Sequence, residues 1–331
     1  MSSPKYAVLA IGNAIVDVIA ETDDDFIKAE SLNKGGMTLI DAERAKTLYS
    51  RMGPGREISG GSAANTLAGL ANLDHKCAFI GQVADDQLGE VFAHDIRATG
   101  IDFAVPARAA DVPTARCLIL VTPDAQRTMN TFLGASQFLP ASTIDPQQIA
   151  DAAILYVEGY MWDPQEPRAA IRQALPLARA AGRKTAFTLS DAFVIDRYRD
   201  DFLSLMAEGA IDILFANEVE IASLAQTDDF EAAVAMAAAQ VPLLVVTRGE
   251  HGAIAVRGGE RVEVPAEPVE HLVDTTGAGD LFAAGVLAGL CEGRDLKQCL
   301  TMGAVCAAEV ISHYGARPEA DLRALISARL G

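Results

Sequence analysis

Short runs of apolar residues recur along the chain, and each run is bounded by turn-forming or charged residues. Runs of this length without alternating polar positions are typical of strands buried on both faces of a parallel sheet. The later runs alternate with segments of helical periodicity, as expected where helices cover such a sheet. The pattern predicts strands at residues 6–11, 78–80, 154–157, 185–189, 211–215 and 243–247, and helices at 168–181, 202–207, 220–224 and 230–239.

Two segments, 32–39 and 114–133, interrupt this alternation. In the second, residues 116–122 and 128–133 flank the turn Pro123-Asp124-Ala125-Gln126, which is typical of a β-hairpin. The apolar run at 7–20 contains polar residues and lacks a basic flank, so we interpret it as a buried strand and not as a signal peptide.

The C-terminal part of the chain has a loop followed by predicted helices at 281–290, 296–311 and 322–330. The chain shows no long repeat and no flexible linker that would separate domains in series. We therefore expect one α/β domain over residues 1–331, with a central, mostly parallel sheet flanked by helices. An inserted small β-sheet lid would be built from about 14–40 and 103–135.

Composition excludes several classes of protein. The 331 residues are 50% hydrophobic and 22% charged, which favours a large packed core over disorder. A net charge of −18 argues against nucleic acid or an anionic membrane as a partner. The five cysteines form no CxxC pair, and the five histidines show no metal-ligand spacing, so we expect a cytoplasmic protein that binds small molecules.

The common nucleotide-binding motifs are absent or incomplete. No Gly-Lys dipeptide occurs, which excludes a P-loop, and the sequence lacks the motif set of protein kinases. A dinucleotide-binding fingerprint is incomplete around Gly277 and Gly279, because Phe282 stands where the third glycine belongs.

The strongest candidate for catalysis is the segment Asp274–Asp280, which leads into a predicted helix. Gly277 and Gly279 permit close approach of a ligand to the main chain, and the N–H groups of a helix start can surround an anionic oxygen. Asp280 beside them could accept a proton from an attacking hydroxyl. Alternatively, Asp280 is one of the acidic residues that often occupy a first helical turn.

Two N-terminal segments are candidates for binding a hydroxylated substrate. Gly60 and Gly61 allow close backbone approach, Ser62 is a natural N-cap, and Asn65 would lie in the first turn of the helix that follows. Asp17 interrupts an apolar run, so it should face a polar cavity or a ligand such as a vicinal diol. The alternatives are an ordinary capped helix and a turn aspartate.

Polar residues also follow predicted strands, at the edge where open α/β sheets bind ligands. Asn217 and Glu220 follow one strand and form either a capping box or a site for Mg²⁺, which prefers oxygen ligands. Thr247 and Gly249 follow the next strand, at a turn that would bind nucleotide or merely connect two elements.

Two further positions lie beside these elements. Arg127 follows the predicted hairpin turn, where it would either reach a phosphoryl group or remain solvated. Tyr160, Met161 and Trp162 follow the strand at 154–157 and form either the wall of a base pocket or an ordinary aromatic cluster.

The segment Asp274–Asp280, continued to Gly285, resembles the second signature of the ribokinase-like (PfkB) carbohydrate and nucleoside kinases. The segment Gly60–Asn65 resembles their first signature, and both stand in the expected order. The spacing Gly12-Asn13-x-x-x-Asp17 is similar to adenosine kinases within this family, as is the segment that starts at Leu189-Ser190-Asp191. The resemblance implies an ATP-dependent phosphotransferase with a β lid over the acceptor.

The resemblance also implies roles for individual residues. These are Asp280 as base; Gly277, Ala278, Gly279 and Arg127 around the transferred phosphoryl group; Asn13, Asp17, Gly60, Gly61 and Asn65 on the acceptor; Asn217, Thr247, Gly249, Gly277 and Gly279 on ATP; and Asn217 and Glu220 on Mg²⁺ through water. Some relatives bind a monovalent cation at positions that correspond to Asp274 and Thr276. Whether this chain does so is left open.

We therefore expect transfer of the ATP γ-phosphoryl group to the 5′-hydroxyl of a nucleoside, with adenosine the favoured acceptor and AMP the product. A sugar kinase of the same fold, acting on fructose or ribose, is the first alternative. A catalytically silent nucleotide-binding regulator is the second. The sequence leaves the choice between monomer and homodimer open, because a β lid can cover its own site or pair with the lid of another chain.

Overall fold

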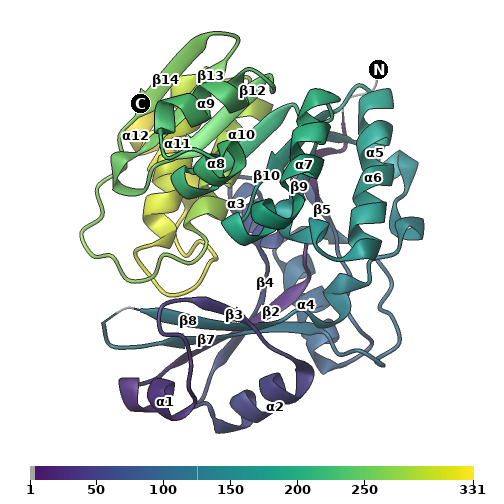
Figure 1. The fold of residues 1–331 in the computed structure, drawn as a ribbon, viewed down its shortest axis with the longest axis vertical. Coiled ribbons are helices and arrows are strands. Elements are labelled where there is room, and N and C mark those ends of the chain that lie inside the picture. Colours follow the sequence, from purple (N-terminus) through teal and green to yellow (C-terminus); the bar gives the residue numbers. More distant parts are fainter. Residues whose placement is uncertain (1–3, 125) are drawn as a thin grey trace.

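The computed structural model describes residues 4–124 and 126–331, which form a large sheet, a small sheet and the helices that cover them (Figure 1). The large sheet has nine strands in the order β14-β13-β12-β11-β10-β9-β1-β5-β6. All neighbouring pairs from β12 to β6 are parallel, whereas β13 and β14 pair antiparallel at one edge. The strands are β1 Tyr6–Ile11, β5 Cys77–Ile80, β6 Asp102–Phe103, β9 Ala152–Glu158, β10 Lys184–Thr188, β11 Ile213–Asn217, β12 Leu243–Thr247, β13 Ala253–Arg257 and β14 Glu260–Val264.

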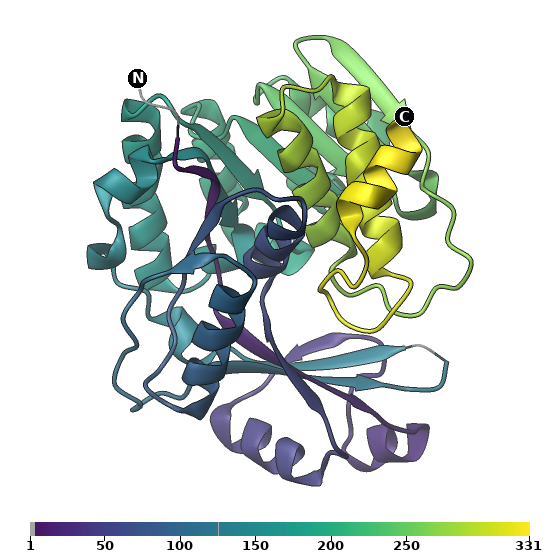
Figure 2. The same ribbon diagram turned by 180° about the vertical axis from the view of Figure 1, so that it is seen from behind.

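Helices cover both faces of the large sheet, as the alternation of apolar runs predicts (Figures 1 and 2). Side chains of β1 alternate between the two cores: Val8 packs with one set of helices and Leu9 with the other. The first set is α3 Ser62–Asn72, α4 Gln87–Ala98, α10 Ala278–Cys291, α11 Leu296–Val310 and α12 Leu322–Leu330. The second set is α5 Pro146–Ala150, α6 Gln165–Ala180, α7 Ala192–Ala207, α8 Glu218–Ala225 and α9 Phe230–Ala238. The expected fold class is confirmed.

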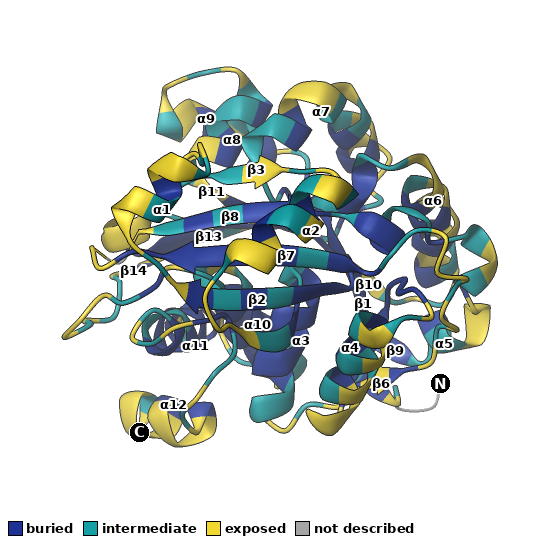
Figure 3. Cartoon of the chain, turned by 90° about the horizontal axis from the view of Figure 1, so that it is seen from below, coloured by how far each residue is buried: buried dark blue, intermediate teal, exposed yellow. Residues whose placement is uncertain are grey.

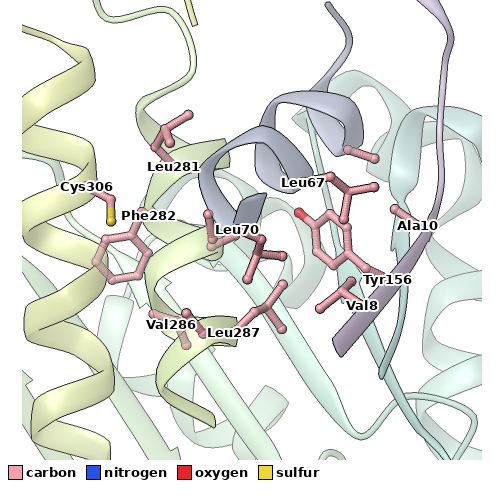
Figure 4. Packing of buried hydrophobic residues seen from close by; sticks show 14 of the residues in the cluster. Val8, Ala10, Leu67, Leu70, Tyr156, Leu281, Phe282, Val286, Leu287 and Cys306 are labelled. Carbon is pink, nitrogen blue, oxygen red and sulfur yellow. The ribbon is translucent and has the colours of Figure 1, made fainter. Parts of the chain in front are cut away.

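The small residues of α10 let this helix lie close to its neighbours. Figure 4 shows the larger apolar side chains of α10 in the core that it shares with α3 and α11. A Cβ atom on Gly285 would lie 2.5 Å from the carbonyl carbon of Met302 in α11. On another face of α10, Leu281 packs against α3, where Gly69 leaves room for it. The helix that begins with Gly277 at its N-cap is therefore fixed by close backbone contact as well as by apolar burial.

We expect Gly285→Val to destabilise the protein by about 1–3 kcal/mol, because the added side chain must push α10 away from α11. Chemical denaturation followed by circular dichroism measures this change. An unchanged unfolding midpoint would contradict the close packing of these two helices.

The small sheet lies against one end of the large domain and has the strand order β3-β8-β7-β2-β4. Its outer face packs on α1 and α2, which lie across it in Figure 3. Its other face carries apolar residues such as Ile119 and Met129, which line the pocket described below. These elements are β2 Ile15–Glu21, α1 Asp24–Ala29, β3 Met37–Leu39, α2 Ala42–Arg51, β4 Arg56–Gly60, β7 Ala115–Val121 and β8 Arg127–Phe132.

The apolar run at 7–20 does not form one strand, which corrects the sequence-based interpretation. It divides into β1 of the large sheet and β2 of the small sheet. The break at Gly12 and Asn13 is held by backbone hydrogen bonds: Gly12 donates to the Ile80 carbonyl, and the Asn13 amide donates to the buried Glu158 carboxylate. Hydrogen bonds to β5 and β9, which lie far along the chain, therefore fix where β1 ends.

Other expectations for the small sheet differ in detail. Within 32–39 only Met37–Leu39 is a strand, and both β4 and α2 come from outside the ranges that we expected to form the lid. The hairpin is confirmed, because β7 and β8 pair antiparallel. In its predicted turn, Ala125 lies outside the described residues. Among the described residues, no helix is long and apolar enough to cross a membrane.

Candidate active site

Two adjacent pockets lie between the carboxyl edge of the large sheet and the small sheet. The first is lined by residues that include Asn13, Asp17, Gly61 and Asn65. The second is lined by residues from the ends of β11 and β12 and from the start of α10. Ser62, Met129, Tyr160 and Thr276 line both pockets, so the two are continuous there.

The second pocket contains the predicted anion-binding helix start. Gly277 is the N-cap of α10 and has a φ of +77°, a backbone conformation that favours glycine. A Cβ atom here would also lie 2.6 Å from the Ala316 Cβ atom. The Ala278 amide donates weakly to the Thr275 carbonyl, at 3.3 Å. The amides of a first helical turn have no partner within their own helix, so they can bind an anion.

Asp280 lies at the junction of the two pockets. Its carboxylate accepts hydrogen bonds from Ser62 Oγ at 2.6 Å and from Asn65 Nδ2 at 3.0 Å. Burial raises the pKa of Asp280, and these two hydrogen bonds oppose the rise. The two signature segments, more than 200 positions apart in the sequence, therefore meet at this carboxylate.

The structure corrects one detail at the start of α3. Gly61, with a φ of +97°, is the N-cap, and no side chain caps this helix. The Ser62 hydroxyl, which we expected as the cap, instead donates to Asp280. Because Gly61 occupies the N-cap position, the Ser62 hydroxyl can hold the candidate base Asp280 in place.

Polar groups of the first pocket lie so close to Gly60 and Gly61 that no side chain would fit at either position. A Cβ atom on Gly60 would overlap the Asp17 carboxylate, and one on Gly61 would overlap the Asn13 carbonyl oxygen. Burial raises the pKa of Asp17 to about 7; Arg317 opposes this rise, whereas Asp280 adds to it. Asp17 lines the pocket as the sequence predicts, at the start of the small sheet.

Glu158, at the end of β9, is a polar residue of the site that sequence reasoning missed. It is fully buried, and it accepts hydrogen bonds from the Asn13 amide at 2.8 Å, the Asn13 side chain at 2.5 Å and the Ala63 amide at 2.8 Å. Burial raises its pKa to about 7. The only signal in the sequence is a carboxylate at the end of an apolar run.

Two buried side-chain oxygens in the first pocket have no hydrogen-bond partner: Asn13 Oδ1 and Asn65 Oδ1. Each amide turns its nitrogen toward a carboxylate, of Glu158 and Asp280 respectively, which leaves the oxygen as an acceptor. A buried acceptor without a donor costs about 1–3 kcal/mol, so both positions favour a ligand that carries hydroxyl groups.

Arg127, on β8, reaches across from the small sheet to the loop before α10. Its Nη1 atom donates to Thr276 Oγ1 at 2.7 Å, and its Nε atom lies 3.6 Å from an Asp274 carboxylate oxygen. The Gly315 amide donates to the other Asp274 oxygen. A guanidinium thus lies beside Asp274, and the question of a monovalent cation near Asp274 and Thr276 stays open.

Asn217 and Glu220 form the capping box of α8 that the sequence suggested as an alternative to a metal site. Both residues line the second pocket, and burial raises the pKa of Glu220 to about 7. The described residues contain no group of three His, Cys, Asp or Glu that could hold a metal ion directly. The side-chain oxygens of Asn217 and Glu220 all accept hydrogen bonds within this capping box, so a Mg²⁺ ion held here through water stays a prediction.

Of the remaining residues that we expected at the site, some line the two pockets and others do not. Thr247 lines the second pocket, whereas Gly249, with a φ of +51°, is not among its lining residues. Tyr160 lines both pockets, as one of the two readings of its cluster expected. Met161 and Trp162 are fully buried in the core. Phe193 also lines the first pocket, with its ring centroid 6.0 Å from that of Tyr160.

The fold and this constellation define a class of protein: an α/β enzyme with an acceptor pocket, a carboxylate and a helix start that can bind an anion. Residues 8–322 match the family described as "pfkB family carbohydrate kinase", and the chain belongs to this family. The protein is thus a nucleoside or carbohydrate kinase, and membership of the family implies ATP as co-substrate.

Some similar proteins are named as adenosine kinases and others as sugar kinases. The structure of adenosine kinase from Sinorhizobium meliloti is 50% identical, with a TM-score of 0.92, and the match covers 98% of this chain and 99% of that one. A probable sugar kinase from Rhizobium etli is 48% identical, with a TM-score of 0.94 and coverage of 99% and 100%. A fructokinase from Klebsiella pneumoniae is 31% identical over 72% of this chain and 79% of its own length.

Proposed function

We propose that the protein transfers the γ-phosphoryl group of ATP to the 5′-hydroxyl of a nucleoside, with adenosine as the favoured acceptor and AMP as product. The observation that carries the proposal is that the first pocket is polar on one side and apolar on the other. Asp17, Asn13 and Asn65 present acceptors for hydroxyl groups, while Tyr160 and Phe193 lie beside apolar residues of the small sheet. A ribose with an attached base matches both sides.

The apolar side of this pocket favours a nucleoside over a free sugar. Ile119 and Met129 of the small sheet, and Leu133 directly after β8, line it together with the two aromatic residues. A sugar has hydroxyl groups on every side and would leave some of them against these side chains without partners, which is unfavourable. A planar base would instead bury its faces there.

In the proposed reaction Asp280 accepts the proton of the 5′-hydroxyl as its oxygen attacks the γ-phosphorus. Ser62 and Asn65 hold the carboxylate in place. The free amides at the start of α10 and the guanidinium of Arg127 would stabilise the negative charge on the transferred phosphoryl oxygens.

The second pocket would hold the nucleotide, with Thr247 at one side and Asn217 and Glu220 near the phosphates. Mg²⁺, when bound, would offset part of the phosphate charge in this acidic protein. The small sheet would act as a lid, because Arg127 on β8 already reaches the loop before α10. A closed lid excludes water that would otherwise hydrolyse ATP.

A sugar kinase is the second candidate function. The names of the Rhizobium etli and Klebsiella pneumoniae relatives favour it. Both functions use the same base and the same helix start, so they differ only in the contacts with the acceptor. Phosphorylation assays with adenosine, ribose and fructose as acceptors distinguish them.

We expect Asp17→Asn to weaken acceptor binding by about 10–150-fold, because a hydrogen bond to a charged group contributes about 1.5–3 kcal/mol. ATP binding in the same variant serves as the control and is expected to change little. Separate calorimetric titrations of the two substrates measure both affinities. Equal losses for both substrates, or no loss, would make Asp17 a structural residue.

The same residue predicts a pH dependence. The pKa of Asp17 is about 7, so its carboxyl is ionised above this pH and protonated below it. Acceptor affinity of the wild-type protein should therefore fall as the pH drops through 7, and Asp17→Asn should remove this component of the dependence. Titrations between pH 5.5 and 8.5 would measure it.

A further inference from the structure

Arg317 lies in the segment between α11 and α12, outside both signature segments, yet its guanidinium reaches the Gly60–Gly61 turn. Its Nε atom donates to the Ser59 carbonyl at 2.9 Å, and its Nη1 atom donates to the Ala64 carbonyl at 2.9 Å. Its Nη2 atom also contacts Ser59 Oγ at 2.9 Å. One side chain thus binds the carbonyls on either side of this turn.

The turn that Arg317 holds determines the position of both carboxylates of the site. Gly60 packs directly against the Asp17 carboxylate. Ser62, two residues further along, donates to Asp280. Movement of the turn would therefore displace the acceptor-binding carboxylate and the candidate base together.

Among the described residues, the hydrogen-bond partners of the guanidinium carry no formal charge, so no direct ion pair there cancels its positive charge. Burial lowers the pKa of Arg317, and Asp95, Asp17 and Asp280 oppose that effect. Conversely, Arg317 and Arg127 are the cations that oppose the burial-driven rise in the pKa of Asp17 and of Asp280. Asp17 is further affected by Asp280 and Asp274, which raise its pKa.

We propose that Arg317 is a positioning residue for phosphoryl transfer, which fixes the Gly60–Gly61 turn through two carbonyls and provides positive charge beside Asp17 and Asp280. This inference rests on the proposed function of these two carboxylates. Two arginines would then serve the reaction: Arg127 from the small sheet, and Arg317 from the segment behind the acceptor pocket.

The charge is tested with Arg317→Met and Arg317→Gln, both of which remove it. Loss of a nearby cation raises the pKa of a carboxylate. The reaction needs Asp280 ionised and acceptor binding needs Asp17 ionised, so both carboxylates contribute to the acid limb. The acid limb of the kcat/KM profile should therefore move to higher pH by about one unit, with a loss of about 10-fold or more at pH 7. Arg317→Gln keeps an amide that can donate to one carbonyl, and it serves if the Met variant does not fold.

The positioning is tested separately with Arg317→Lys, which keeps the charge but cannot donate to both carbonyls in a fixed planar arrangement. We expect its acid limb to stay within a few tenths of a pH unit of wild type. Its kcat/KM for the acceptor should nevertheless fall by about 5–10-fold, because the turn is less constrained. Wild-type kcat/KM in this variant would overturn the positioning role.

Arg56→Met is the matched control, because Arg56 is an exposed arginine of β4 that also pairs with the segment after α11, through Glu319. It should leave the pH profile unchanged. If the neutral Arg317 variants keep the wild-type acid limb, even with a lower rate, the charge role is wrong, and only the Arg317→Lys result decides the positioning role.

The assay uses whichever acceptor the wild-type protein phosphorylates best. A preference for a sugar would overturn adenosine as the acceptor but leave the prediction for Arg317 intact. An unchanged acid limb in the neutral variants, with adenosine phosphorylated efficiently, would overturn the charge role of Arg317 alone.

Discussion

Asp280→Asn is expected to lower kcat by about 10²–10⁴-fold while ATP still binds, which is the usual contribution of a positioned general base. The carboxylate lies where the two pockets meet, and Ser62 and Asn65 both donate to it. Burial raises the pKa of Asp280 above its ordinary value, and the two hydrogen bonds oppose this rise. An amide at this position keeps the shape of the side chain but cannot accept the hydroxyl proton.

Steady-state kinetics and nucleotide titration of the variant measure the two effects. Asp295→Asn is a suitable control, since Asp295 is an exposed carboxylate at the start of α11 and lies outside both pockets. Turnover of Asp280→Asn at the wild-type rate would remove Asp280 from the mechanism, whichever acceptor is used.

The ranking of acceptors should show the second large effect: kcat/KM for adenosine above that for 2′-deoxyadenosine, and far above that for ribose or fructose. Burying about 100 Å² of a base at ~25 cal/mol per Å² gives about 2.5 kcal/mol, close to 70-fold, which a free sugar cannot gain. The kcat/KM for 2′-deoxyadenosine should be lower than that for adenosine, because the polar groups that would bind the missing 2′-hydroxyl remain unpaired.

Coupled assays under saturating Mg·ATP would give these values for each acceptor. Phe193→Ala is the informative control: it should lower kcat/KM for adenosine and leave the weak activity with ribose almost unchanged, since in the proposed complex only the base would contact this ring. Fructose or ribose phosphorylated as efficiently as adenosine would favour the sugar-kinase alternative. No transfer to any acceptor would contradict the proposed reaction altogether.

Some features of this site could be predicted from local sequence alone. The apolar runs located six strands of the large sheet, because a strand covered on both faces must be apolar along its whole length. The apolar run at 281–290 likewise predicted a helix, although α10 begins three residues earlier, at Ala278, with Gly277 as its N-cap. The capping box of Asn217 and Glu220 follows from a four-residue pattern.

Other features depend on contacts between residues far apart in the chain. Gly12 and Asn13 interrupt the apolar run at 7–20, but nothing local shows that β1 and β2 belong to different sheets. The Glu158 carboxylate, 145 positions after Asn13, accepts the hydrogen bond that holds the break. Likewise the Ser62 hydroxyl looks like a helix cap in the sequence, and only the arrival of Asp280 from α10 gives it another partner.

The sequence by itself determined the family, the layered α/β architecture and the short segments that surround the candidate site, because periodicity and turn residues act within a few positions of the chain. Only the tertiary structure decided which polar groups face each other across that site. Arg317 and Ser59 are 258 positions apart, and Arg127 and Thr276 are 149 apart. Hydrogen bonds and electrostatic interactions depend on distance in space, which no local pattern of residues encodes.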